Sequence, residues 1–134
     1  MRSVILGLAA LAASVLIAGC GGTAGDLMSI DISGGPAPEK HTVVVSGDGR
    51  GSCDRGALKE LPSERVIDAR AVERDAADLA RKAATYPPKA GGRRYELRTN
   101  DGVVRWSEGS PGIPSVLPRA QLLALQLDQL LCRG

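Results

Sequence analysis

The chain has 134 residues and a formal net charge of +2, and its aromatic residues are two tyrosines and one tryptophan. A near-neutral chain with so few aromatic side chains lacks the basic surface and base-stacking groups that nucleic-acid-binding proteins use, so we expect no nucleic-acid partner. The length suits one domain, whose core must be built from Leu, Val, Ile and Ala.

An apolar segment follows Arg2 and ends in Leu16-Ile17-Ala18-Gly19-Cys20. It has the charged start, apolar middle and small-residue end of a secretory signal. The last five residues resemble a bacterial lipobox, which implies cleavage before Cys20 and a diacylglyceryl group on its thiol. We therefore expect a signal peptide over 1–19, a flexible tether over 20–26, and a domain over 27–134 anchored by lipid to the extracytoplasmic side of the cell envelope. The alternatives are an ordinary cleaved signal, with Cys20 as an incidental thiol, and a retained membrane anchor.

Alternating residues predict a strand over 27–32 and β-branched residues predict another over 42–45, with a Gly- and Pro-rich turn over 33–38 between them. Segment 47–52 is expected to be a loop. It resembles a phosphate-binding loop but lacks the Gly-Lys-Ser/Thr ending, so we expect no phosphate site there. We expect a short helical turn over 57–61. Apolar residues at helical spacing predict the main helix over 68–85, ended by Pro87 and Pro88.

The second half repeats this order. We expect a strand over 93–99 with Tyr95 and Leu97 facing the core and a solvated start at Arg93 and Arg94. An Asp-Gly hairpin turn leads to a return strand over 103–107, and a rigid loop over 109–114 precedes a Leu-rich helix over 117–131. The sequence therefore predicts an α+β fold of order ββαββα, with two helices packed on one face of an antiparallel sheet.

Cys53 and Cys132 are the cysteines that remain after Cys20. Outside the cytoplasm such a pair favours a disulfide bond, with two free thiols as the alternative. Two cysteines and His41 fall short of the four Cys or His ligands that a structural zinc ion uses, so we predict no metal and no cofactor.

Catalysis requires a nucleophile or a base with an orienting partner. His41 is the single histidine, and we expect it to be an exposed turn residue. The chain contains no Gly-x-Ser-x-Gly, His-Glu-x-x-His or Cys-x-x-Cys motif, so we predict that it is not an enzyme. Trp106 fits two roles, a contact residue for a partner or the one large aromatic side chain of the core.

One resemblance extends over most of residues 28–131. It rests on the segment Ile30-Asp31-Ile32-Ser33-Gly34-Gly35, a Leu/Ala-rich middle helix, a strand from Tyr95 to Thr99 followed by Asp101-Gly102, and Pro114 before a Leu-rich final helix. This order is similar to the emfourin family, small bacterial inhibitors of protealysin-like metalloproteases. The resemblance implies a protein partner and inhibitory contacts near the Ser33-Gly34-Gly35 turn.

We therefore expect a lipid-anchored envelope lipoprotein that acts as a non-enzymatic protein-binding module, with protease inhibition as one form of that function. It would contact the membrane through the lipid on Cys20, and its partner would be a metalloprotease or another envelope protein. The alternative is a structural or accessory envelope lipoprotein without inhibitory activity. The predicted contact residues come from the first turn, the return strand and the loop over 109–114: Ser33, Gly34, Gly35, Trp106 and Ile113.

Overall fold

A computed structural model of the protein describes residues 25–36 and 39–134. The predicted lipidation site, Cys20, and the end of the predicted first turn, Ala37 and Pro38, lie outside these residues. The elements in chain order are β1 (Asp26–Gly34), β2 (His41–Ser46), β3 (Arg50–Cys53), β4 (Lys59–Glu60), α1 (Ser63–Asp75), α2 (Ala77–Arg81), β5 (Arg93–Thr99), β6 (Gly102–Ser107) and α3 (Val116–Leu131).

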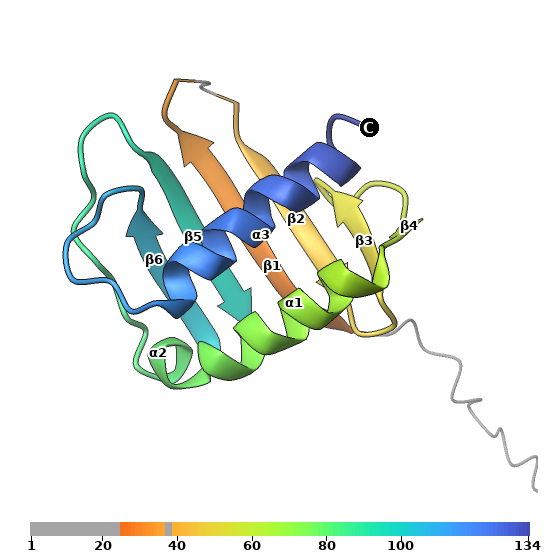
Figure 1. Ribbon diagram of the computed structural model, residues 1–134, viewed down its shortest axis with the longest axis horizontal. Coiled ribbons are helices and arrows are strands. Elements are labelled where there is room, and N and C mark those ends of the chain that lie inside the picture. Colours follow the sequence, from red (N-terminus) through yellow and green to blue (C-terminus); the bar gives the residue numbers. More distant parts are fainter. Residues whose placement is uncertain (1–24, 37–38) are drawn as a thin grey trace, which may run out of the picture.

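The strands form one antiparallel sheet in the order β4-β3-β2-β1-β5-β6. Helices α1 and α3 lie across one face of this sheet (Figure 1). The prediction of an α+β fold with helices on one face of an antiparallel sheet is thus confirmed. The observed order has two more strands and one more short helix than the ββαββα prediction.

Strand β1 joins the two halves of the sheet, since it pairs with β2 on one side and with β5 on the other. Ile30 lies opposite Val43 of β2 and Leu97 of β5, and all three side chains are buried. Successive residues of a strand point to opposite faces, so the alternate residues of β1, Asp31 among them, point away from the helices. Tyr95 and Leu97 face the core, as predicted.

The predicted loop over 47–52 and the predicted helical turn over 57–61 are both wrong. Arg50–Cys53 is strand β3, and Lys59–Glu60 is an extended edge strand that pairs with it. Gly51 explains the first error: a Cβ at this position would lie 2.9 Å from Leu131 and 3.1 Å from Leu61. A glycine inside a strand often marks such a close approach, although in the sequence it resembles a loop residue.

The predicted helix over 68–85 begins earlier and ends earlier than expected. Helix α1 covers Ser63–Asp75, a break at Ala76 follows, and α2 ends at Arg81. The segment beyond is extended because it pairs with the outer edge of β6: the Arg105 amide donates to the Ala84 carbonyl at 3.0 Å, and the Tyr86 amide donates to the Arg105 carbonyl at 2.9 Å. Pairing with the sheet overrides the helical preference of the alanines.

Helix α3 starts one residue before the predicted start and ends where predicted. Its buried stripe includes Leu123, Leu127 and Leu131, whereas Leu130 is 42% exposed. The stripe also includes a carboxylate, Asp128, which an apolar pattern does not anticipate.

The predictions of the disulfide bond and of the N-terminal tether have different outcomes. Cys53 and Cys132 form the predicted disulfide, with an S–S distance of 2.08 Å, and tie β3 to the end of α3. The expected tether over 20–26 extends too far, because the Gly25 carbonyl accepts from the Gly47 amide at 2.8 Å and Asp26 begins β1. No helix among the described residues has both the length and the hydrophobicity needed to cross a membrane.

Candidate functional site

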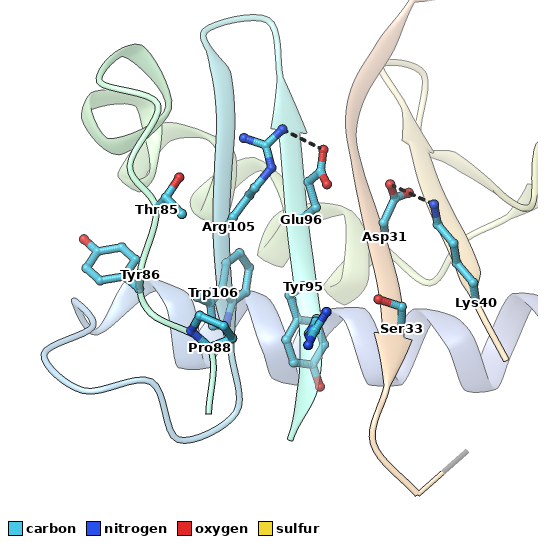
Figure 2. Close-up of a pocket in the computed structure, with 11 residues that line it drawn as sticks. Asp31, Ser33, Lys40, Thr85, Tyr86, Pro88, Tyr95, Glu96, Arg105 and Trp106 are labelled. Carbon is cyan, nitrogen blue, oxygen red and sulfur yellow. Dashed lines mark hydrogen bonds and ion pairs between the residues drawn. The ribbon is translucent and has the colours of Figure 1, made fainter. Parts of the chain in front are cut away.

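The sheet face opposite α1 and α3, which we call the open face, carries a hollow of about 300 Å³. Figure 2 shows it with the helices behind the sheet. Side chains from β1, β5 and β6 form its floor, and the chain after α2 forms one wall. The lining residues are Asp31, Ser33, Lys40, Thr85, Tyr86, Pro88, Arg94, Tyr95, Glu96, Arg105 and Trp106.

Basic groups outnumber acidic groups on this floor. Glu96 accepts from Arg98 and lies 3.4 Å from Arg105, so one carboxylate serves two guanidinium groups. Asp31 accepts from the Thr42 hydroxyl at 2.7 Å and lies 4.0 Å from the Lys40 ammonium group.

Arg94 is exposed and forms no ion pair with any residue in the described part of the chain. The local excess of positive charge favours an anionic ligand.

The wall of the hollow is held in place by hydrogen bonds rather than by its own secondary structure. The Lys89 amide donates to the Ser107 hydroxyl at 2.8 Å, and the Ser110 hydroxyl donates to the Pro87 carbonyl at 2.8 Å. Both serines are buried, and the wall carries the half-buried Tyr86. A fixed apolar wall beside a basic floor loses little conformational entropy on binding.

The first turn and the loop over 109–114 lie at one end of the sheet, where β1 and β6 finish (Figure 1). Arg93 connects them: its side chain lies against Gly35, its carbonyl accepts from the Glu108 amide at 2.8 Å, and its guanidinium group lies 3.1 Å from the Glu108 carboxylate. The hydrogen bond to Glu108 raises the pKa of Arg93. Burial, followed by a hydrogen bond to Glu108, raises the pKa of Tyr95 well above its ordinary value.

The predicted contact residues take different places around these features. Ser33 lines the hollow, Gly34 is the last residue of β1, and Gly35 begins the turn beyond it. Ile113 is half-buried and packs against the core. Trp106 is 2% exposed and stacks on Tyr95 at a centroid distance of 5.4 Å, so its side chain belongs to the core, and its role as a partner contact stays a prediction.

The sequence patterns do not reveal the two residues that define the hollow best, Arg94 and Tyr86. Arg94 was assigned to a solvated strand start, and Tyr86 was placed after the end of a helix. Only the alternation of β5 indicates that Arg94 and Glu96 share a face with Ser33.

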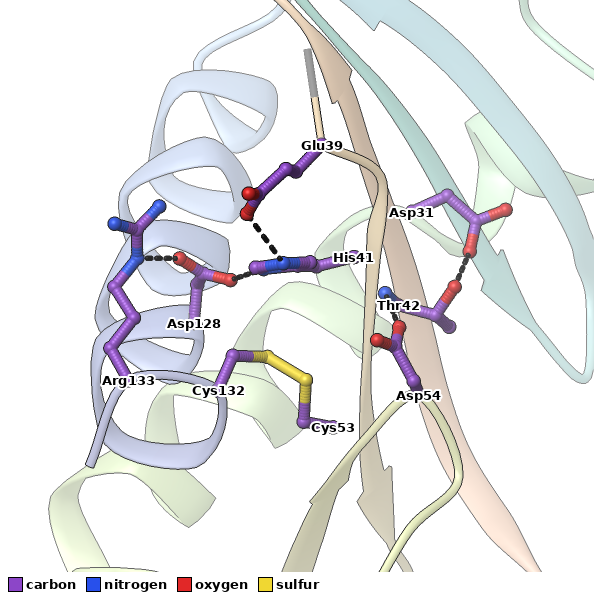
Figure 3. The surroundings of a disulfide bond; sticks show 9 residues. All are labelled: Asp31, Glu39, His41, Thr42, Cys53, Asp54, Asp128, Cys132 and Arg133. Atoms are coloured by element: carbon purple, nitrogen blue, oxygen red, sulfur yellow. Dashed lines mark hydrogen bonds and ion pairs between the residues drawn. A yellow bond between two sulfur atoms is a disulfide. The ribbon is translucent and has the colours of Figure 1, made fainter. Parts of the chain in front are cut away.

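His41 is not the exposed turn residue that we expected. It begins β2, its side chain is 20% exposed, and its Nδ1 lies 2.5 Å from Asp128 Oδ1 (Figure 3). Asp128 Oδ2 accepts from Arg133 Nε at 2.8 Å, and His41 Nε2 lies 3.5 Å from a Glu39 oxygen. A lone carboxylate in the apolar stripe of α3 is the signal that could have indicated this pair.

The environment of this pair favours its charged form. The hydrogen bond to Asp128 raises the pKa of His41. Burial acts to raise the pKa of Asp128, but hydrogen bonds from Arg133 and His41 outweigh it and lower that pKa. The cysteine sulfurs beside the pair are bonded to each other, so the disulfide form offers it no thiol to activate.

The chain matches no known family model, and no curated protein or solved structure is detectably similar to it. The open face and the His41 cluster are the two places in the described structure whose chemistry points to a function.

Proposed function

We propose that this protein is a lipid-anchored, non-enzymatic binding module of the cell envelope, and that its open face binds an acidic segment of a partner protein. The observation that carries the proposal is the hollow on the open face, where exposed Arg94 has no ion-pair partner among the described residues and basic groups outnumber acidic ones. Inhibition of a metalloprotease, which the emfourin resemblance implies, is one form that such binding would take.

The chemistry of the hollow suits carboxylates. Arg94 and Arg105 present planar guanidinium groups that can bind a carboxylate through two parallel hydrogen bonds, and Lys40 adds a point charge at the far side. Tyr86 and Pro88 offer apolar surface for the stem of the bound side chain. A segment that lies across the strands would reach these groups together.

Two observations support the location in the envelope. The segment that ends at Cys20 resembles a lipobox, and the Cys53–Cys132 bond belongs to the class of covalent links that persists in oxidising compartments. Metabolic labelling with a fatty-acid probe tests the anchor: the wild type should be labelled and the Cys20→Ala variant should not. Equal labelling of both would refute the anchor and leave the binding proposal standing.

Binding at the open face is tested with a synthetic Glu- and Asp-rich peptide and the full-length protein in detergent. We expect backbone amide NMR signals of β5, β6 and residues 84–88 to shift, and the affinity to fall as salt rises. Arg94→Glu with Lys40→Glu should weaken binding at least tenfold. The matched control, Arg74→Glu with Lys82→Glu, makes the same change in net charge at exposed positions of α1 and the end of α2.

Equal weakening by both double variants would mean that the peptide senses net charge only, and the proposal would be wrong. A pull-down from envelope extracts with the same variants then identifies the partner. A metalloprotease that is captured by the wild type and the control, lost with the open-face variant, and inhibited in solution would establish the inhibitor form. Capture of other envelope proteins without inhibition would favour an accessory role.

A further inference from the structure

We propose that reduction of the Cys53–Cys132 disulfide uncovers a metal-binding site, formed by the two thiolates and His41, for an ion of the Zn²⁺ type. One ligand atom from each of these three residues lies within 4.8 Å of the other two. The sequence predicted no metal because two cysteines and one histidine fall short of the four Cys or His ligands of a structural zinc ion. The fold brings them to one place, and this site is separate from the open face.

The sheet register, together with the disulfide, sets this arrangement. Cys53 lies directly opposite Val43 in the antiparallel pair of β2 and β3. His41 is two residues before Val43, so His41 and Val43 point to the same face of the sheet. Cys53, opposite Val43, points to that face as well. Cys132 follows the last turn of α3, and its amide donates to the Asp128 carbonyl at 2.9 Å. Hydrogen bonds that do not involve sulfur therefore hold each ligand-bearing segment.

The group behind the histidine also fits a metal site. Histidines that bind metals usually donate their second ring N–H to a carboxylate, which fixes the ring and makes it a stronger ligand. Asp128 Oδ1 holds His41 Nδ1 at 2.5 Å, and Arg133 holds the other oxygen of Asp128 (Figure 3). Nε2 then remains as the ligand atom, and the Glu39 carboxylate, 3.5 Å from it, could provide the fourth ligand in place of water.

The redox step is an ordinary thiol–disulfide exchange. A dithiol reductant gives two electrons and two protons to the S–S bond, which becomes two thiols, and the reductant itself becomes a disulfide. A Zn²⁺ ion then binds the two sulfurs as thiolates, and both thiol protons pass to solvent. Two sulfurs, one imidazole nitrogen and a fourth oxygen ligand make a tetrahedral set typical of zinc.

The test uses the full-length chain in detergent with Cys20→Ala, so that Cys53 and Cys132 are the only thiols. The chain is reduced with a phosphine and then titrated with Co²⁺ under nitrogen. We expect one Co²⁺ per chain, a thiolate-to-cobalt charge-transfer band, and the intense visible bands of tetrahedral cobalt. Zn²⁺ should displace the cobalt, and the oxidised chain should show none of these bands.

Variants distinguish a preformed site from two reactive thiols. Cys53→Ser and Cys132→Ser should each abolish the charge-transfer spectrum of the wild type, and His41→Gln should weaken binding about tenfold or more and change the visible bands. Glu60→Gln, which removes an exposed carboxylate from neighbouring β4, is the matched control and should bind as the parent does.

Three results would overturn the proposal. The oxidised chain could bind cobalt with the affinity of the reduced chain, or His41→Gln could bind with unchanged affinity and spectrum. The third result would come from circular dichroism of the reduced chain. If reduction unfolds the chain and Zn²⁺ does not restore the fold, no metal site survives reduction.

Discussion

Asp48 determines how the turn between β2 and β3 responds to acid. Its carboxylate accepts from Arg50 Nε at 2.9 Å and Nη2 at 2.7 Å, and also from the Ser46 hydroxyl. These bonds, with Arg50 first, lower the pKa of Asp48 to about 2. Because the folded-state pKa lies below the ordinary value, the contribution of Asp48 to stability is complete above that value and is lost as the pH falls towards 2.

This effect predicts a titration midpoint that NMR can measure at the Asp48 carboxyl group. The wild type should titrate with a midpoint near 2, and Arg50→Gln should move the midpoint up towards 3.8, the ordinary value for Asp. Arg55→Gln, which removes an exposed partner of Asp26 instead, should leave the Asp48 midpoint in place. An unchanged midpoint in Arg50→Gln would show that the ion pair does not form in solution.

Single residues also show what the sequence could not reveal about the candidate sites. His41 and Asp128 are 87 residues apart, and their contact depends on how α3 crosses β2. The carboxylate of Asp128 stands out in the apolar stripe of α3, but nothing in that stripe identifies His41 as its partner. By contrast, Ser33 was identified from the Gly- and Pro-rich turn that follows it, since residues that favour turns lie next to one another in the sequence. Ser33 does line the hollow.

The elements differ in how far local sequence determines them. Strand β5 was predicted with its observed bounds, since its alternation and the Asp-Gly turn after it are both local signals. Residues 84 and 85 were predicted as helix and are extended, because the edge of β6 provides backbone hydrogen bonds that a helix prediction does not consider. Strand β3 was missed because Gly51 packs closely against two leucines, which only the folded chain brings there.

Helix α3 provides a prediction that separates its two apolar faces. Leu127 is completely buried in the core, whereas Leu122 is 58% exposed on the opposite side. Leu127→Ala should destabilise the domain by about 2–5 kcal/mol, because it removes buried methyl groups and leaves a cavity. Leu122→Ala makes the same chemical change and should alter the free energy of unfolding by less than about 0.5 kcal/mol. Urea unfolding followed by circular dichroism measures both, and equal losses would contradict the burial pattern.

At the scale of the whole molecule, the disulfide closes most of the domain into one loop. Cys53 and Cys132 are separated by 79 residues, and the loop between them contains β4, α1, α2, β5, β6 and α3. The bond thus restricts the unfolded chain strongly, and it does so near one edge of the sheet. The open face lies on the other side of the sheet from the helices, so the bond and the proposed binding surface can be altered independently.

Removal of the disulfide should therefore lower stability without abolishing the fold. In a Cys20→Ala chain, the Cys53→Ala and Cys132→Ala double substitution should reduce the free energy of unfolding by about 2–5 kcal/mol, out of the roughly 5–15 kcal/mol typical of a domain. Reduction of the same chain with intact cysteines should produce a similar loss, because both treatments remove the same restriction on the unfolded state. Urea unfolding with and without reductant measures these values. A double variant as stable as the oxidised parent would mean that the bond does not constrain the unfolded chain.

If the reduced parent regains stability when Zn²⁺ is added and the double variant does not, the gain comes from ion binding to the folded state through these thiols.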